Sequence, residues 1–401
     1  MLLPILSATT LALSTRALAA TNTTTAQSRA LAAANTLQTW YNSATGIWNT
    51  CGWWNGANCM TTLANLAALH IDDTFNDVAR GVFANTFAVA ATVSNPIPGR
   101  GNDAASYLSS NGTGYYPATE GVPTGAANTA LWLDGSYDDD LWWGLAWVAA
   151  YDATSNTDYL DLAEGTFYHL SNAWPSKCGN GGIDSNYEHV YVGAIANELF
   201  LSLAAHLANR AEDSAFYRDW AQRQWAWFQD SGLINENNTI NDGLTNDCTN
   251  NGQTIWSYNQ GVILGGLVEL HRASGDDSDS DSNSSSNSTY LDAAGEIARG
   301  AIAELADENH VLHDACEPAG CAPDATQFKG IFMRNLRALH AVAPDDIYAE
   351  VIEASAESIW ANDRTDVNAL GVVWAGPVDA AVVDASTHSS ALDALVAAIE
   401  K

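Results

Sequence analysis

Residues 194-AIANELFLSLAAHLA-208 show the pattern that dominates this chain, in which alanine and leucine recur with the three- and four-residue spacing of an α-helix. Two polar residues inside this run, Asn197 and Glu198, need hydrogen-bond partners if the helix is buried. Similar segments recur along the whole sequence, whereas strand patterns are few and short. The sequence therefore predicts an all-α protein.

About a dozen helices of ordinary length are expected, separated by loops rich in Gly, Asn and Pro. They cover residues 27–43, 59–70, 74–92, 139–153, 158–173, 190–209, 213–230, 256–273, 290–306, 326–342, 346–361 and 385–400. No internal repeat stands out, and periodicity alone leaves a bundle, a solenoid and a closed double ring of hairpins open. The polar segment 275-GDDSDSDSNSSSNST-289 has nothing apolar to bury and is expected to be a disordered loop.

The charge of the chain limits the classes of partner that it can bind. Lys and Arg total 15 against 47 Asp and Glu, for a formal net charge of −32. Such an excess argues against nucleic-acid and anionic-membrane partners. Residues 1–19 have the apolar stretch and small residues of a secretory signal peptide. No other run is long enough to cross a bilayer, and the C-terminus lacks a lipid-anchor signal, so an exported monomer without a membrane anchor is expected.

The cysteines and the glycosylation sequons are consistent with an exported protein. The 6 cysteines are Cys51, Cys59, Cys178, Cys248, Cys316 and Cys321. Proximity along the chain favours disulfides between the first two and between the last two, which leaves Cys178 with Cys248; free buried thiols are the alternative. Asn-X-Ser/Thr triplets place glycosylation candidates at Asn22, Asn111, Asn237, Asn283 and Asn287. No zinc-binding spacing is present, so no metal is expected.

The segment 137-YDDDLWWGLAWVAAYDAT-154 places three adjacent carboxylates directly before a Trp-rich helix. Carboxylates that face the same space raise each other's pKa, and an apolar wall raises it further. Such a pair can supply one proton donor and one anion at the same pH, which are the two groups that glycoside cleavage needs. Trp142 and Trp143 offer flat apolar faces that suit a sugar ring.

The same segment also has a purely structural interpretation. Asp138, Asp139 and Asp140 could cap a helix that begins near Leu141, where its dipole favours negative charge. The tryptophans would then pack in the core. From this stretch alone the two interpretations are about equally supported.

Resemblance to a known family favours the catalytic interpretation over the purely structural one. YDDDLWWGLAW resembles the signature of glycoside hydrolase family 76, the endo-α-1,6-mannanases, in which an adjacent Asp pair precedes two variable positions, an aromatic pair and Gly-Leu-Ala. Further blocks occur in the family's order, so the resemblance extends over most of the mature chain. These blocks are 53-WWNGAN-58, 194-AIANELFLSLAAHLA-208, 254-TIWSYNQGVILGGLVEL-270 and 328-FKGIFMRNL-336.

The resemblance implies one (α/α)6 barrel over residues 20–401, no cofactor and a retaining mechanism. By its alignment, Asp138 is the nucleophile, Asp139 the general acid/base, and Asp140 a spare. Retention needs the two carboxyl groups about 5–5.5 Å apart. Successive side chains diverge around a helix axis, so we expect the pair to lie on an irregular turn and the helix to begin after Asp139.

The resemblance also implies which residues contact the sugar. They are Trp142, Trp143, Tyr258, Asn259, Gln260, Asn58, Phe328 and Lys329. Alternatively, residues 258–260 could cap a helix that begins near Gly261, and Lys329 could simply meet solvent. The expected function is hydrolysis of α-1,6-linked mannan or manno-oligosaccharides of a fungal-type cell wall or glycoprotein. Transglycosylation and non-catalytic mannan binding are the alternatives.

Overall fold

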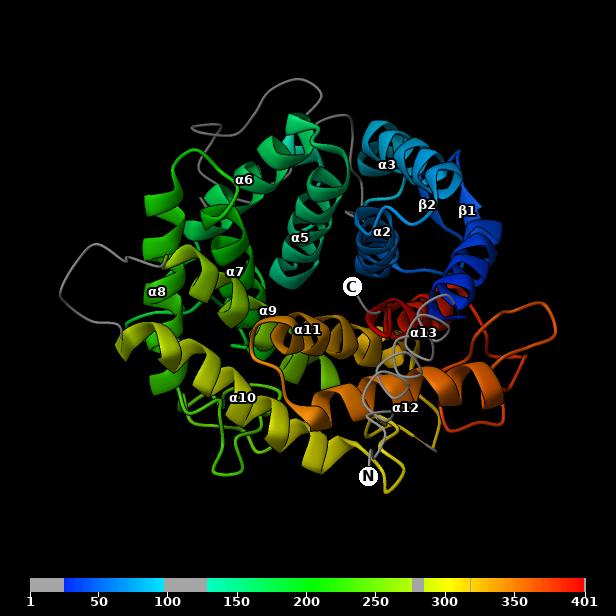
Figure 1. The fold of residues 1–401 in the computed structure, drawn as a ribbon. Helices are drawn as coiled ribbons and strands as arrows, with labels where there is room; N and C mark the ends of the chain where they lie inside the picture. Colours follow the sequence, from blue (N-terminus) through cyan, green and yellow to red (C-terminus); the bar gives the residue numbers. More distant parts are fainter. Residues whose placement is uncertain (1–24, 97–127, 276–284, 318, 400–401) are drawn as a thin grey trace, which may run out of the picture.

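The computed structural model describes residues 25–96, 128–275, 285–317 and 319–399 (Figure 1). The predicted signal peptide 1–19 and the sequons at Asn22, Asn111 and Asn283 lie outside the described residues, as does the side chain of Asn287. The sequon residue Asn237 is described and is exposed.

The described part of the chain is mostly helical. In chain order its elements are a helix over residues 25–37, η1 (Gln38–Trp40), β1 (Tyr41–Asn42), β2 (Ile47–Trp48), α2 (Trp53–Ala68), α3 (Asp73–Val93), η2 (Thr129–Leu131), α5 (Tyr137–Thr154), α6 (Thr157–Ser171), α7 (Ala194–Ala208), α8 (Ser214–Asp230), α9 (Ser257–Ala273), α10 (Ser285–Leu305), η3 (Pro323–Gln327), α11 (Phe328–Val342), α12 (Asp346–Asn362) and α13 (Ala385–Ala397). β1 and β2 form a short antiparallel pair.

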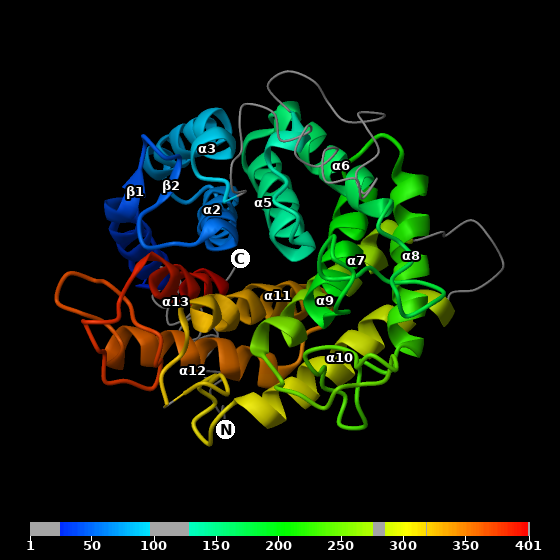
Figure 2. The same ribbon diagram turned by 180° about the vertical axis from the view of Figure 1, so that it is seen from behind.

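The helices form a closed double ring. α2, α5, α7, α9, α11 and α13 each pack against the next, and α13 returns to α2 (Figures 1 and 2). Outside them, α3, α6, α8, α10 and α12 each pack on the inner helix that precedes them in the chain. The predicted all-α fold and (α/α)6 barrel are therefore confirmed, and the ring is the arrangement that periodicity had left open.

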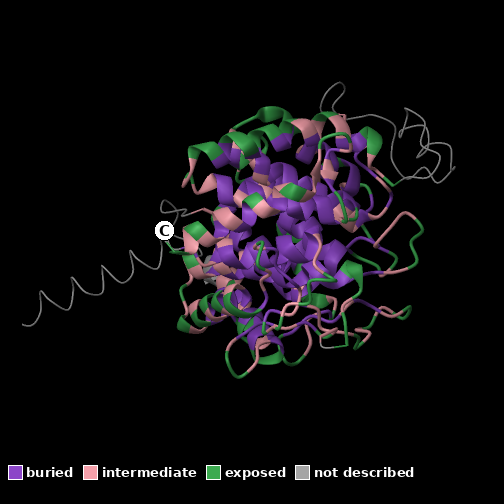
Figure 3. Ribbon diagram, turned by 90° about the vertical axis from the view of Figure 1, so that its right-hand side faces the viewer, coloured by how far each residue is buried: buried purple, intermediate pink, exposed green. Residues whose placement is uncertain are grey.

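Burial explains which helices are inside. Every residue of α7 except His206 is buried, whereas α8 buries one stripe, Tyr217, Ala221, Gln224, Trp225 and Phe228. A helix that is apolar all round needs neighbours on every side, and one with a single apolar stripe needs only one. Buried residues accordingly fill the centre of the molecule and exposed ones its outer helices (Figure 3).

Asn197 shows how the barrel positions its loops. Its side chain accepts a hydrogen bond from the Ile183 amide at 2.8 Å and donates to the Ile183 carbonyl at 2.9 Å. Gln224 of α8 also donates to it, at 3.0 Å. The buried amide therefore ties the loop before α7 to both rings. Its neighbour Glu198 has no hydrogen-bond partner for either carboxyl oxygen among the described residues.

The disulfide prediction is partly confirmed. Cys178–Cys248 and Cys316–Cys321 are bonded. The predicted Cys51–Cys59 bond is wrong: both thiols are free, with their sulfur atoms 3.2 Å apart. Cys59 is fully buried on α2, and desolvation raises the pKa of its thiol, which disfavours the thiolate that disulfide formation requires.

Several predicted helix boundaries are wrong, among them the start at position 190, since α7 begins at Ala194. α10 begins at Ser285, so the last residues of the expected loop 275–289 are helical. α2 begins at Trp53, six residues before the predicted start at position 59, and the chain leaves the first helix after residue 37 for η1 and β1. Extending an existing helix costs little because each added residue gains a hydrogen bond, so α2 and α10 begin before their apolar patterns do. No helix among the described residues is long and apolar enough to cross a membrane.

Candidate active site at the first turns of the inner helices

The inner helices present their N-terminal turns to the same end of the barrel, because each outer helix returns the chain before the next inner helix begins. Aromatic side chains at or next to these turns form a continuous row. Trp142 of α5 stacks on Trp54 of α2 with ring centroids 5.7 Å apart, and Trp54 lies 6.1 Å from Phe328 of α11. Phe328 stacks on Tyr258 of α9 at 3.7 Å and contacts Trp256 at 5.5 Å. We call these five residues the aromatic row.

The three aspartates lie in the first turn of α5. The expectation that this helix begins after Asp139 is wrong, because α5 begins at Tyr137 with Ser136 as its N-cap. The Cα–Cβ bonds of a helix tilt toward its N-terminus, so first-turn side chains lean toward the open end of the helix. The dipole and the free amide groups of that end also favour carboxylates. Adjacent aspartates can therefore face the barrel end without an irregular turn.

The turn before α5, Asp134–Ser136, gives each aspartate a different setting. Gly135 adopts φ +96°, and a Cβ there would come within 2.7 Å of the Tyr187 ring, so the turn requires glycine. Ser136 donates its hydroxyl to Asp138 at 2.8 Å. The Asp134 amide donates to Asp140 at 2.8 Å, and Asp140 is only 1% exposed.

The Asp134 and Asp139 side chains are hydrogen-bonded to each other. Asp138 and Asp139 are half-buried, in contrast to Asp140. The structure thus separates one enclosed carboxyl from two that remain partly exposed, and these two are the pair predicted from the sequence.

Burial raises the pKa of both partly exposed carboxyls. The pKa of Asp138 is raised by desolvation, against which the Ser136 hydrogen bond acts. The pKa of Asp139 is raised well above its usual value by desolvation first, and then by the charges of Asp134, Asp138 and Asp140. Asp139 therefore holds its proton at a higher pH than a free aspartate.

Further polar groups border the aromatic row. Trp54 donates its indole N–H to Asp324 at 2.9 Å, and Asp324 in turn raises the pKa of Asp138. The Tyr258 hydroxyl has a pKa well above its usual value because of burial and of nearby carboxylates, Asp138 first among them. Tyr258 consequently stays protonated as a hydrogen-bond donor beside the acidic turn.

Several predicted contact residues are held by the protein itself. Gln260 accepts from the Ile240 amide and donates to its carbonyl, both at 2.8 Å. Asn58 donates to the Trp54 carbonyl at 3.3 Å and accepts from Arg334. These two side chains are buried and position loops and helices beneath the row.

Lys329 and Trp143 are also enclosed. Lys329 is 2% exposed, pairs with Glu317 and donates to the Val372 carbonyl at 2.7 Å, so the alternative that it meets solvent is wrong. Trp143 is 1% exposed and packs against Trp53 at 4.6 Å, as the structural interpretation expected. Asn259 is buried with neither amide atom partnered among the described residues.

Sequence reasoning missed four residues at this end of the barrel: Asp134, Trp54, Trp256 and Asp324. The two tryptophans lie inside the blocks 53-WWNGAN-58 and 254-TIWSYNQG-261, so aromatic residues at helix starts are the signal that indicates them. Asp134 lies in the turn before α5 and Asp324 in the short helix η3; aspartate is common in such connecting segments, and nothing local distinguishes these two.

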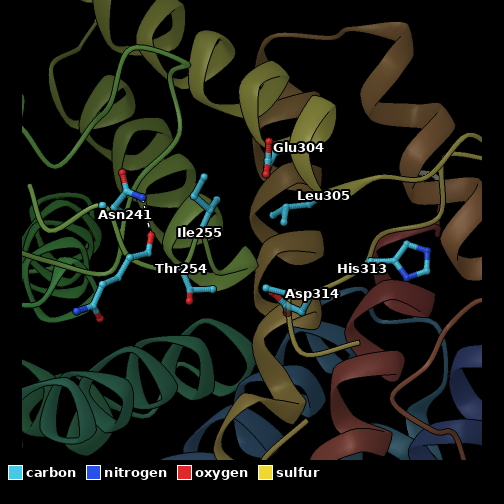
Figure 4. A pocket seen from close by; sticks show the side chains of 10 residues that line it. Asn241, Thr254, Ile255, Glu304, Leu305, His313 and Asp314 are labelled. Atoms are coloured by element: carbon cyan, nitrogen blue, oxygen red, sulfur yellow. Dashed lines mark hydrogen bonds between the residues drawn. The ribbon is translucent and has the colours of Figure 1, made fainter. Parts of the chain in front are cut away.

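A pocket of about 820 Å³ lies beside the start of α9 (Figure 4). It is lined by Asn241, Gly252, Gln253, Thr254, Ile255, Glu304, Leu305, His313, Asp314 and Ala315. Its polar side chains are largely engaged within the protein: Asp314 accepts from the Ser257 amide at 3.0 Å, and Asn241 donates to the Gln253 carbonyl at 2.6 Å. In the described ranges no group of three His, Cys, Asp or Glu residues could hold a metal ion.

Comparison with known proteins agrees with this geometry. The profile of Glycosyl hydrolase family 76 matches residues 122–400. The chain belongs to this family. It is 27% identical over 284 residues to mannan endo-1,6-alpha-mannosidase DFG5 of Candida albicans, which is 65% of this chain and 60% of that protein. The DFG5 mannosidase of Saccharomyces cerevisiae is 26% identical over 59% of this chain and 54% of its own length. The chain thus spans less than two thirds of these relatives.

Solved structures share the fold of this family 76 member. One is an inactive variant of the α-1,6-mannanase GH76A of Salegentibacter sp. HEL1_6, with alanine at two successive aspartates, in complex with α-1,6-mannotetrose. It has a TM-score of 0.70 at 19% identity and covers 93% of this chain and 98% of its own. Dfg5 of Chaetomium thermophilum in complex with glucosamine also reaches 0.70, at 20% identity, over 93% and 90% of the two chains.

Proposed function

We propose that this protein is a retaining endo-α-1,6-mannosidase that hydrolyses the α-1,6-linked mannan backbone. The observation that carries the proposal is the pair of partly exposed carboxyls, Asp138 and Asp139, in the first turn of α5 beside the aromatic row. Family membership and the names of the curated relatives support the choice of linkage. The signal-peptide pattern at residues 1–19 supports action outside the cell on wall or glycoprotein mannan.

The two carboxyls have different protonation states in this mechanism. Asp138 accepts the Ser136 hydroxyl, which stabilises its anion, so it serves as the nucleophile. Asp139 keeps its proton because burial and neighbouring charges raise its pKa, so it serves as the general acid. Trp54 and Tyr258 are partly exposed and present flat apolar faces on which sugar rings stack, whereas the predicted contact residue Phe328 is 4% exposed and supports these two rings from below.

The reaction proceeds by two displacements. Asp139 protonates the glycosidic oxygen as its bond to C1 breaks, and Asp138 forms a covalent ester to C1. Water then attacks C1, giving its proton to Asp139 and releasing Asp138. Both steps invert the anomeric centre, so the first product is the α-anomer.

The test is product release from unbranched α-1,6-mannan, with the anomeric configuration followed by NMR. Wild type should release α-products first, and Asp138→Asn and Asp139→Asn should each lose at least about 100-fold in kcat, the order of a lost acid/base or nucleophile. Asp158→Asn, an exposed aspartate in the first turn of α6, is the matched control and should retain full activity. Initial β-products would contradict the retaining assignment.

Azide distinguishes the two roles. Added to the Asp139 variant with an aryl manno-oligosaccharide, azide should restore turnover and give the α-azide, because the covalent intermediate still forms. With the Asp138 variant it should give the β-azide by direct attack. Reversed anomers would exchange the assignments, and mannan binding by a wild type without turnover would indicate a binding protein.

A further inference from the structure

The turn before α5 contacts all three of the successive aspartates, and its contact with the general acid Asp139 is not explained by the two-residue mechanism. The Asp134 amide holds Asp140, and the Ser136 hydroxyl holds Asp138. Asp139 is the remaining member, and its contact is with the side chain of Asp134. The carboxyl of Asp134 therefore lies against the group that the mechanism uses as its acid.

Two carboxyl groups can hydrogen-bond only if one of them carries a proton. Asp134 already accepts the Ser136 amide at 2.8 Å, which stabilises its anionic form. Asp139 is instead surrounded by three carboxyls, which disfavour its anion. The shared proton consequently resides mainly on Asp139, which donates it to Asp134.

We propose that Asp134 is a positioning residue for the general acid, and that Asp134 and Asp139 hold a single proton between them in the resting enzyme. This proposal rests on the proposed function. The shared proton is the one that moves to the glycosidic oxygen, which takes the electron pair of the broken C1–O bond while Asp138 bonds to C1. In the second step water returns a proton to Asp139, and the contact with Asp134 forms again.

Pairing of this kind has a physical advantage for an enzyme with one acid/base residue. After proton transfer, two carboxylates face each other, and their repulsion makes Asp139 a stronger base for the second step. In the resting state the same repulsion is relieved by the shared proton. Burial agrees with this view, since it raises the pKa of Asp134 to about 6 and, together with the neighbouring charges, raises the pKa of Asp139 well above its usual value.

Asp138 and Asp140 act on the pair directly, and other titratable groups at this end of the barrel limit which substitutions are informative. They are Asp138 and Asp140 on α5, Asp324 in η3, Tyr258 on α9, Asp242 before α9, Glu198 on α7, His169 in the last turn of α6 and Arg334 of α11 over the Trp142 ring. On the packed helix α2 the titratable side chain is Cys59, whose neighbours are Cys51, Ser389 and Asp384 and not the aspartate pair. Substitution of Asp134 changes only the member that contacts Asp139 by its side chain.

The experiment compares the pH dependence of kcat/KM for wild type and Asp134→Asn on α-1,6-manno-oligosaccharides. The asparagine can still accept the Ser136 amide, but its NH2 group donates to Asp139 and removes the neighbouring charge. The basic limb should therefore move to lower pH by about one unit or more, with about a tenfold loss at neutral pH for each unit. Asp158→Asn is the control and should keep the wild-type profile.

A substrate with a better leaving group distinguishes a positioning role of Asp134 from general damage to the active site. A dinitrophenyl manno-oligosaccharide needs no proton to depart, so Asp134→Asn should lose much less on it than on the natural linkage. An unmoved basic limb, or equal losses on both substrates, would overturn the proposal while leaving the proposed function intact.

A titration that does not depend on turnover distinguishes failure of this proposal from failure of the proposed function. In wild type with ¹³C-labelled aspartate, Asp134 and Asp139 should titrate as a coupled pair in two separated steps. In Asp134→Asn, or in Asp134→Ala if the first variant is poorly folded, the Asp139 signal should titrate at lower pH. Independent single titrations in wild type would overturn the shared proton. Failure of wild type to cleave any α-1,6-mannan would overturn the proposed function instead.

Discussion

At the scale of single residues, surroundings rather than residue type set the chemistry of this site. Asp138, Asp139 and Asp140 are identical and adjacent, yet one accepts a serine hydroxyl, one meets another carboxyl and one is enclosed. These differences come from the turn at Asp134 and Gly135 and from the walls around it. No property of the local sequence distinguishes the three aspartates.

The aromatic row supports a prediction at the same scale. Tyr258 is half-buried and stacks on Phe328 at 3.7 Å, so its ring and not its hydroxyl forms that contact. Tyr258→Phe should keep most substrate affinity, whereas Tyr258→Ala should lose about 1 kcal/mol of binding, roughly fivefold in kcat/KM. Kinetics on manno-oligosaccharides of increasing length measure this. Tyr168→Ala, on the exposed face of α6, is the control, and an unchanged kcat/KM in Tyr258→Ala would remove the ring from the site.

At the scale of elements, close helix contacts position the site. α9 and α11 approach so closely at Gly261 that a Cβ there would lie 2.5 Å from the Phe332 Cα atom. Both helices carry members of the aromatic row in their first turns. Because the obstructing atoms are backbone, a side chain can be accommodated only if the helices separate.

Gly261→Ala should therefore destabilise the fold by about 1–3 kcal/mol, the usual cost of overpacking. The matched control is Gly81→Ala on α3, where nothing lies within 4 Å of the added methyl group. Alanine is the better helix former, so the control should gain up to about 1 kcal/mol. Denaturant unfolding measures both, and equal effects of the two substitutions would contradict the close contact.

At the scale of the whole molecule, the ring is closed by contacts between the ends of the described chain. His388 of α13 donates its Nε2–H to the Ala33 carbonyl in the helix over residues 25–37, at 2.8 Å. Its Nδ1 accepts the Leu370 amide at 2.9 Å. Both bonds together require the neutral imidazole, and burial lowers the pKa of His388 to about 4.

The depressed pKa predicts a loss of stability in acid. Below about pH 6.5 the unfolded chain binds a proton that the folded His388 refuses, so stability falls until the pH reaches about 4. At pH 5 this amounts to about 2 kcal/mol. His388→Gln should be less stable than wild type at pH 7, and the difference should narrow by about that amount at pH 5. A difference independent of pH would show that His388 is not a neutral buried link.

Prediction from sequence succeeded where the information is local. Apolar spacing located the helices, because burial of one helix face leaves a periodic trace, and the order of the aromatic and acidic blocks indicated the barrel. It failed at helix ends. It also failed at Lys329, which was given a solvent-exposed position as its alternative but forms a buried ion pair with Glu317. It also failed for Cys51 and Cys59, since proximity along the chain does not decide whether two thiols bond.

The sequence by itself determined the helices, their amphipathic or fully apolar character and the acidic pair, because these depend on residues within a few positions of one another. Only the tertiary structure decided which carboxyl is enclosed, which meets a second carboxyl and which aromatic rings form a row. Those properties arise between Asp134 and Asp139, between Trp54 and Phe328 and between Tyr258 and Phe328. They depend on desolvation and on contacts between separate elements, which the chain acquires only when the ring closes.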